Sequence, residues 1–308
     1  MWTLLAFISA LCLGFYDISK KIALRDHPVV DVLTLSVCFS AVLLSIPLFC
    51  SRLWPEMMMG TPFYVPSLDL QAHLFTVLKS LIVLSSWVCA YVALKHLPIS
   101  VVSPMQATRP MWTLVGALLI FGERLNIWQW IGVCVALGTI LAFAIFTRKP
   151  RSPRESRESR DPSMNRYYVA LALAILLGAA SGLYDKYLMR RYDHNAVQVY
   201  YTFYQAVMMI VFFAVDRYRH PRSHRATSFS SLLPIALISI FLIISDNVYM
   251  LALRDPDSLI AVVSTIRRGG AVIGFAYGLL FLKEENPLPK VLCMIGIGIG
   301  LLCLAFGA

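Results

Sequence analysis

The chain has 308 residues, of which 58% are hydrophobic and 14% are charged, and its mean hydropathy is +0.70. A soluble domain has roughly 45–50% apolar and about 25% charged residues, so the composition excludes an ordinary soluble protein and indicates a polytopic membrane protein. The net charge of +10 does not indicate nucleic-acid binding, because the basic residues gather in short loops, where they orient membrane helices.

Apolar stretches run the length of the chain. A helix needs about 20 apolar residues to cross a bilayer, and long stretches without alternation favour helices over a barrel. We predict an all-α polytopic membrane protein with ten transmembrane helices, at residues 2–24, 31–50, 73–94, 98–121, 127–146, 167–189, 195–215, 231–252, 257–282 and 290–307. The first stretch lacks a basic start and a small-residue cleavage site, which predicts a retained helix.

The first predicted helix carries "GFYDISKK", with Tyr16 and Asp17 in its last third. Asp17 precedes Lys20 and Lys21 by three and four residues, a spacing that favours a local ion pair. A carboxyl group at low dielectric also binds a proton readily, so Asp17 is equally a candidate for proton coupling. Tyr16 is a candidate substrate contact, and a place in an interfacial aromatic belt is the alternative.

The third and fourth predicted helices read "WVCAYVALKHLPISVVSPMQATRPMW", with Trp87, Gln106 and Arg109 inside the membrane. Arg109 lies near the midplane, where an arginine costs roughly 3 kcal/mol. Pro110 removes a backbone donor from the helix. Helices broken at matching places in two halves point to a transporter site, although proline is also commoner in membrane helices generally. Trp87 and Gln106 are further candidates for lining a cavity.

Residues 147–166, "TRKPRSPRESRESRDPSMNR", form the most polar stretch and have no periodic apolar face. Such a segment predicts a disordered linker. It divides the chain into a first repeat, residues 1–146, and a second repeat, residues 167–308.

The second half repeats features of the first. Its first helix carries "GLYDKYLMRR", so that Tyr184 and Asp185 match Tyr16 and Asp17. Asp185 has the same two interpretations as Asp17, and Tyr184 fits an aromatic belt. Each half has five predicted helices, an odd number, so the second half enters the membrane from the opposite side. We therefore predict two inverted five-helix repeats, with a substrate site between them near the midplane.

The stretch "VVSTIRRGGAVIGF" places Arg267 and Arg268 near the midplane of the ninth predicted helix. Neighbouring residues point about 100° apart on a helix, so the two arginines do not share one role. Alignment without a gap pairs Arg267 with Arg109, whereas Arg268, followed by a glycine, resembles Arg109 followed by proline. Both pairings stay open.

Two interpretations account for the intramembrane charges. In the first, the arginines close buried ion pairs with Asp17, Asp185 and Asp246. In the second, at least one arginine faces a central cavity and binds an anionic group in a bidentate geometry. Glu123 and either Glu284 or Glu285 lie just past the ends of the fourth and ninth predicted helices, and we expect them at the membrane surface rather than in a cavity.

The last predicted helix contains "IGIGIGLL", with Gly296 and Gly300 in GxxxG spacing. This spacing suits a homodimer interface or packing within the chain. The seven cysteines and six histidines show no metal-ligand spacing, and no catalytic or phosphate-binding motif is present. We expect no metal, no cofactor and no enzymatic activity.

The segment from Trp87 to Phe143, with its proline-containing turn, membrane Pro110 and "GER" turn, resembles an EamA domain of the drug/metabolite transporter superfamily. Asp246 to Phe306 resembles a second one. The resemblance implies transport and does not name the cargo. Together with the intramembrane arginines it leads us to expect a secondary transporter that moves a small organic anion or zwitterionic metabolite by alternating access, and we add proton coupling as a hypothesis. The alternatives are a flippase for a lipid-linked phosphate, of polyprenyl-phosphate or phospholipid type, and a membrane assembly protein without transport. We expect an integral protein of a bacterial inner membrane.

The basic residues also predict an orientation. Of the 27 lysines and arginines, 17 fall on the side of the linker and 6 on the side of the N-terminus. The positive-inside rule then places the linker in the cytoplasm and both termini outside. Resemblance to the family favours the opposite orientation, and we give the charge count more weight.

Overall fold

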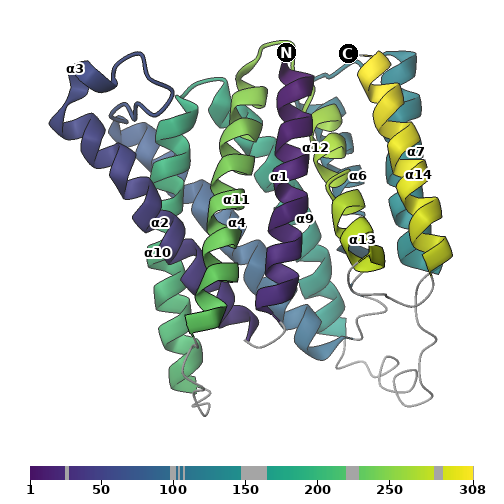
Figure 1. The fold of residues 1–308 in the computed structure, drawn as a ribbon, viewed down its shortest axis with the longest axis horizontal. Coiled ribbons are helices and arrows are strands. Elements are labelled where there is room, and N and C mark those ends of the chain that lie inside the picture. The colour runs from purple at the N-terminus through teal and green to yellow at the C-terminus, as the bar shows by residue number, and fades with distance from the viewer. Residues whose placement is uncertain are drawn as a thin grey trace. The chain divides into compact units, whose positions relative to one another are not determined.

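A computed structural model of the protein describes residues 1–24, 28–97, 102, 105–106, 108–146, 165–219, 229–280 and 287–307. These residues form helices and connecting turns without a strand (Figure 1). The helices are α1 (Trp2–Ala23), α2 (Val29–Leu53), α3 (Pro55–Met58), α4 (Leu70–His96), α6 (Arg109–Ile120), α7 (Ile127–Phe146), α9 (Asn165–Met189), α10 (His194–Arg219), α11 (Phe229–Arg254), α12 (Ile260–Arg268), α13 (Ala271–Leu280) and α14 (Pro287–Phe306).

Seven of the described helices are long and apolar enough to cross a membrane, and two shorter apolar segments lie at Arg109–Ile120 and Val291–Phe306. This agrees with the expected all-helical membrane protein. The predicted ninth helix is divided into α12 and α13, and the start of the predicted fourth helix is described only in part. Most of the linker, residues 147–164, as well as Glu284 and Glu285, lie outside the described residues. The number of ten crossings and the inverted repeat stay predictions.

The helices gather into two compact units, and each combines segments of both sequence halves. Unit 1 consists of Met1–Leu81 and Tyr187–Asp255, and unit 2 consists of Ile82–Lys186 and Pro256–Ala308. The boundaries fall inside α4 and α9, so each of these helices contributes to both units.

In unit 1, α1 packs along α11, and α2 packs against α10 and α11 (Figure 1). Serine side chains join the paired helices. Ser9 Oγ donates to the Ser245 carbonyl over 2.8 Å, and Ser245 Oγ donates to the Ser9 carbonyl over 2.9 Å. Ser239 Oγ likewise donates to the Ser36 carbonyl over 2.7 Å. Small polar residues of this kind let membrane helices approach closely and satisfy their hydroxyl groups between helices.

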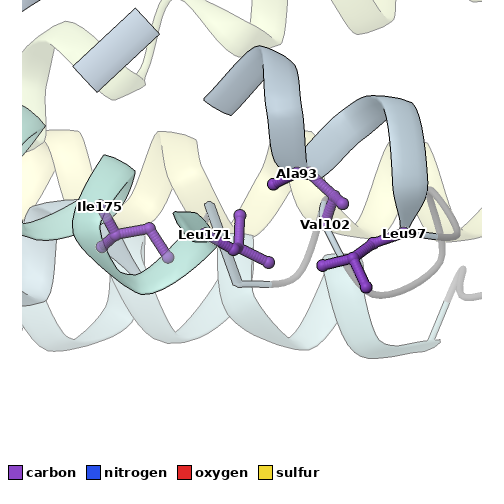
Figure 2. Close-up of a cluster of buried hydrophobic side chains, with 5 residues drawn as sticks. All are labelled: Ala93, Leu97, Val102, Leu171 and Ile175. Atoms are coloured by element: carbon purple, nitrogen blue, oxygen red, sulfur yellow. The ribbon is translucent and has the colours of Figure 1, made fainter. Parts of the chain in front are cut away.

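In unit 2, apolar side chains of α4 and α9 meet in a buried cluster (Figure 2). Ala93 and Leu97 of α4 pack there with Leu171 and Ile175 of α9, and Val102 joins them from the following segment. Ser86 Oγ donates to the Ala174 carbonyl over 2.8 Å in the same helix pair. These contacts hold the second part of α4 beside α9, next to the residues considered as a substrate site below.

α7 and α14 form the second tight pair of unit 2 (Figure 1). A Cβ atom on Gly296 would lie 2.5 Å from Thr139 Oγ1 of α7, and one on Gly300 would lie 2.8 Å from Ala136 Cβ. Contacts this short require glycine at both places. The GxxxG pair therefore packs within the chain, the second of the two alternatives, and association of two copies stays a prediction.

Candidate substrate-binding site

A helix break positions Arg109 in unit 2. α6 begins at Arg109, directly after a turn at Thr108. Pro110 occupies the first turn of α6, where a missing N–H costs nothing because no intrahelical partner exists there. The Thr108 hydroxyl donates to the Met105 carbonyl over 2.7 Å and does not cap α6. The arginine thus stands at the positive end of an uncapped helix.

The Arg109 guanidinium lies among neutral oxygen atoms. Its Nη2 is 3.4 Å from Ser86 Oγ, 3.4 Å from Gln106 Oε1 and 3.3 Å from the Ala174 carbonyl. Its Nε is buried and has no hydrogen-bond partner among the described residues. None of these contacts is a carboxylate, so the described surroundings leave the positive charge of Arg109 uncompensated.

Gly178 of α9 makes room for this guanidinium. A Cβ atom at this position would lie 2.5 Å from Arg109 Nε and closer still to Cζ. Any larger residue therefore displaces the arginine or α9. The Arg109 guanidinium therefore packs closely against α9 at Gly178.

A second helix break adjoins Arg267 and Arg268. α12 ends at Arg268, and Gly269 and Gly270 form the turn before α13. A Cβ atom on Gly269 would lie 2.7 Å from Leu301 Cδ1 of α14, so the turn packs closely. Arg267 is half-buried and Arg268 is exposed. The predicted ninth helix is interrupted at these glycines, and both arginines end the helix that precedes the interruption.

The remaining candidates are divided between the units. Asp185 is buried on α9 and Tyr184 precedes it, half-buried, while Trp87 is half-buried on α4 next to Ser86; all belong to unit 2. Of the predicted site residues, Gln106 and Arg109 are the two between which a direct hydrogen bond is described.

Three candidates belong to unit 1. Asp17 is exposed on α1, and Asp246 is half-buried on α11. Tyr16 packs against the buried cluster between α1, α2 and α11, and Lys20 Nζ lies 5.6 Å from the centre of its ring. Tyr16 therefore has a packing role on α1 whether or not it contacts a substrate.

The expectation that Glu123 lies at the membrane surface is wrong, because its side chain is only 2% exposed and pairs with Lys186 Nζ over 2.6 Å. Its two oxygens also accept the N–H groups of Ile260 and Ala261, at 2.6 and 3.1 Å, so that the carboxylate caps α12. Lys186 Nζ donates to the Ser258 carbonyl over 2.5 Å as well. The start of α12 is therefore fixed by a buried ion pair.

Comparison with known proteins agrees with this architecture. Residues 1–145 match the model of the EamA-like transporter family. The match covers 145 of the 308 residues, and over this range the chain is similar to that family. The EamA match and the apolar helices together indicate an integral membrane protein. The fold is shared with a solved crystal structure of 12% sequence identity and TM-score 0.73, over 99% of this chain and 96% of the other. No match was found among curated proteins.

Proposed function

We propose that this EamA-type protein is a secondary transporter that moves a small organic anion or zwitterion by alternating access, with Arg109 holding the anionic group. The observation that carries the proposal is the uncompensated guanidinium. A charged arginine inside the membrane costs roughly 3 kcal/mol or more and faces a polar partner or a watery cavity. Arg109 has neutral oxygens around it, a buried Nε without a partner and a close glycine backbone. A carboxylate or phosphate of the substrate is the missing partner.

The N-terminus of α6, next to the guanidinium, also favours an anionic ligand. α6 starts at Arg109 without a side-chain cap, and helix N-termini favour anions through their free N–H groups and dipole. A planar guanidinium binds carboxylate or phosphate in a bidentate geometry. Gln106 and the more distant Trp87 are proposed to complete this part of the site.

The pairing of helices supports the proposed inverted repeat. If α1, α2, α4, α6 and α7 of the first half correspond in order to α9, α10, α11, α12–α13 and α14 of the second, then α2–α10, α6–α12 and α7–α14 each pair a helix with its own counterpart. The α1–α11 pair corresponds to the α4–α9 pair, and both are joined by a serine hydroxyl that donates to a carbonyl. A two-fold exchange of the halves thus leaves these five pairs unchanged, as in the inverted repeats of many transporters.

In this scheme Arg267 or Arg268 is the counterpart of Arg109 in the second half. Both stand at a helix break, as Arg109 does, and the half-buried Arg267 is the better placed. Asp17 or Asp185 is proposed to compete with the substrate for arginines and to couple movement to protons, and Asp246 is proposed as a further site residue. Tyr16 is proposed as a further substrate contact. We also propose a bacterial inner membrane and a cytoplasmic linker.

The test is uptake into liposomes, screened with a panel of labelled small carboxylates and phosphates. Losing one guanidinium contact costs roughly 1.5–3 kcal/mol, or about 10- to 150-fold in affinity, so Arg109→Gln is expected to lose transport to that extent. Arg109→Lys restores it only in part, because an ammonium lacks the bidentate fork. Arg124→Gln, at an exposed arginine, is the matched control. Wild-type transport by folded Arg109→Gln, checked by size-exclusion chromatography, would overturn the proposal.

A further inference from the structure

Unit 1 contains a cavity of about 620 Å³. It lies among α2, α10, α11 and the segment that follows α3. Its volume falls in the range of about 300–1,000 Å³ that is typical of small-molecule sites. Most of its lining is aliphatic, and Ile46, Ile240 and Ile244 on its border are exposed. Among the described residues, the lining includes no ionisable side chain apart from the Cys50 thiol, so the cavity is apolar in character and open on an apolar side.

Three carboxamides form the polar wall of this cavity. Asn247 Nδ2 donates to Asn195 Oδ1 over 2.9 Å and to Gln198 Oε1 over 2.8 Å. Asn195 Nδ2 donates to two carbonyls of the segment that follows α3, at 2.8 and 3.1 Å. Gln198 Nε2 donates to the Ile243 carbonyl over 2.7 Å. The amide groups therefore use most of their N–H bonds on one another and on the backbone.

One amide oxygen of this wall, Asn247 Oδ1, can still accept a hydrogen bond. Asn247 lines the cavity, is half-buried and accepts no hydrogen bond from the described residues through its Oδ1. The hydrogen bonds that join α10 to α11 and to the segment after α3 account for the N–H donors of the three amides, but they leave this acceptor unused. A polar group in apolar surroundings is costly unless it is hydrogen-bonded. The group that fits is a donor, such as a hydroxyl or an amide N–H.

We propose that this cavity binds a neutral amphiphile, whose hydroxyl or amide N–H donates to Asn247 Oδ1 and whose aliphatic body lies against α2 and α11. An anion does not suit the cavity, because carbonyl oxygens repel it and no cationic side chain lines the wall. The site is therefore separate in chemistry from the proposed anion site at Arg109. Its lining belongs wholly to unit 1, whereas Arg109 belongs to unit 2.

Photolabelling of the full chain in lipid nanodiscs tests the proposal. The probe is a diazirine derivative of 1-decanol, and mass spectrometry locates the adducts. We expect saturable labelling within residues 43–50 and 240–248, which line the cavity. Unlabelled 1-decanol should compete about tenfold better than decyl methyl ether, which has no donor; a factor of ten equals about 1.4 kcal/mol, the size of one neutral hydrogen bond. Decanoate should compete least.

Two variants separate the site from general lipid contact. Ile244→Trp fills the exposed border of the cavity and is expected to abolish the labelling, whereas Leu233→Trp, exposed on the same helix but outside the cavity, leaves it unchanged. Asn247→Leu is expected to remove the preference for alcohol over ether. Equal competition by the alcohol and the ether would overturn the donor requirement, and strongest competition by decanoate would overturn neutrality. Labelling that Ile244→Trp does not reduce would overturn the site itself.

Discussion

Glu123 and Lys186 form a buried ion pair in unit 2, and we expect substitution of Glu123 to destabilise the protein more than substitution of Lys186. Glu123 accepts from Lys186 Nζ at 2.6 Å and from two backbone N–H groups at the start of α12. The side chains of Lys186 and Glu123 are 1% and 2% exposed. Water therefore cannot replace a lost partner, and the cost of each substitution depends on which charge is left behind.

Glu123→Ala leaves a buried ammonium without its carboxylate and removes the cap of α12. Breaking a buried pair in this way costs about 3–5 kcal/mol. Lys186→Met leaves the carboxylate with two N–H donors and the positive end of α12, so we expect a smaller loss, about 1.5–3 kcal/mol, the value of one hydrogen bond to a charged group. The double variant Glu123→Gln with Lys186→Met should lose less than the sum of its two single variants, because no buried charge remains.

The free energy of unfolding in mixed micelles, from SDS titration followed by circular dichroism, measures these differences. Glu56→Gln, an exposed carboxylate on α3, is the matched control and is expected to stay within about 0.5 kcal/mol of the wild type. Additive losses in the double variant would refute the coupling. A Lys186→Met loss as large as that of Glu123→Ala would refute the stabilising role of the α12 N-terminus.

Gly178→Ala is expected to reduce anion uptake at least tenfold without unfolding the protein, because its methyl group would meet the Arg109 guanidinium; wild-type uptake would contradict the close packing. Asp193 accepts from the N–H groups of Asn195 and Ala196 at the start of α10. Burial alone would raise its pKa, but the neighbouring His194, whose Nδ1 lies 3.7 Å from Oδ2, and the hydrogen bonds from these N–H groups outweigh burial and hold the pKa below its usual value. The carboxylate therefore stabilises the fold above its unfolded pKa of about 3.9 and loses this effect as pH falls through the lower folded value. Asp193→Ala should cost about 1 kcal/mol at pH 7, with a smaller difference at pH 3 in thermal melts; a constant difference would exclude the ionised form as the cause. A fluorescent reporter at the C-terminus should stay dark if the charge count gives the right orientation, and bright cytoplasmic fluorescence would reverse it.

The helices could be predicted well from the sequence, because long apolar stretches and interrupting residues are local signals. α6 begins beside Pro110, whose missing backbone N–H disfavours a helix interior. The contact between Gln106 and Arg109 joins two predicted site residues. These features depend on hydropathy and backbone chemistry within a few residues, which a single sequence displays.

Contacts between distant segments gave no such signal. Gly178 is one small residue among several in an apolar helix, and its role follows only from the arginine packed against it. Glu123 and Lys186 are separated by 63 positions. A carboxylate that directly follows a helix suggests an interfacial position, and the sequence does not display the partners that bury it. The role of Gly178 and the burial of Glu123 both depend on tertiary contacts, which a single sequence does not display.

The composition of the two units has a consequence for synthesis on the ribosome. Unit 1 joins Met1–Leu81 to Tyr187–Asp255. During synthesis, α1 and α2 therefore lack their packing partners α10 and α11 until most of the chain has been made. Serines such as Ser9 and Ser36, whose interhelical partners come late, face lipid or insertion machinery in the meantime. A fragment that ends at the linker would lack both complete units. Co-expression of the two halves as separate chains, which provides the late helices, is therefore expected to restore a stable protein where either half alone is degraded.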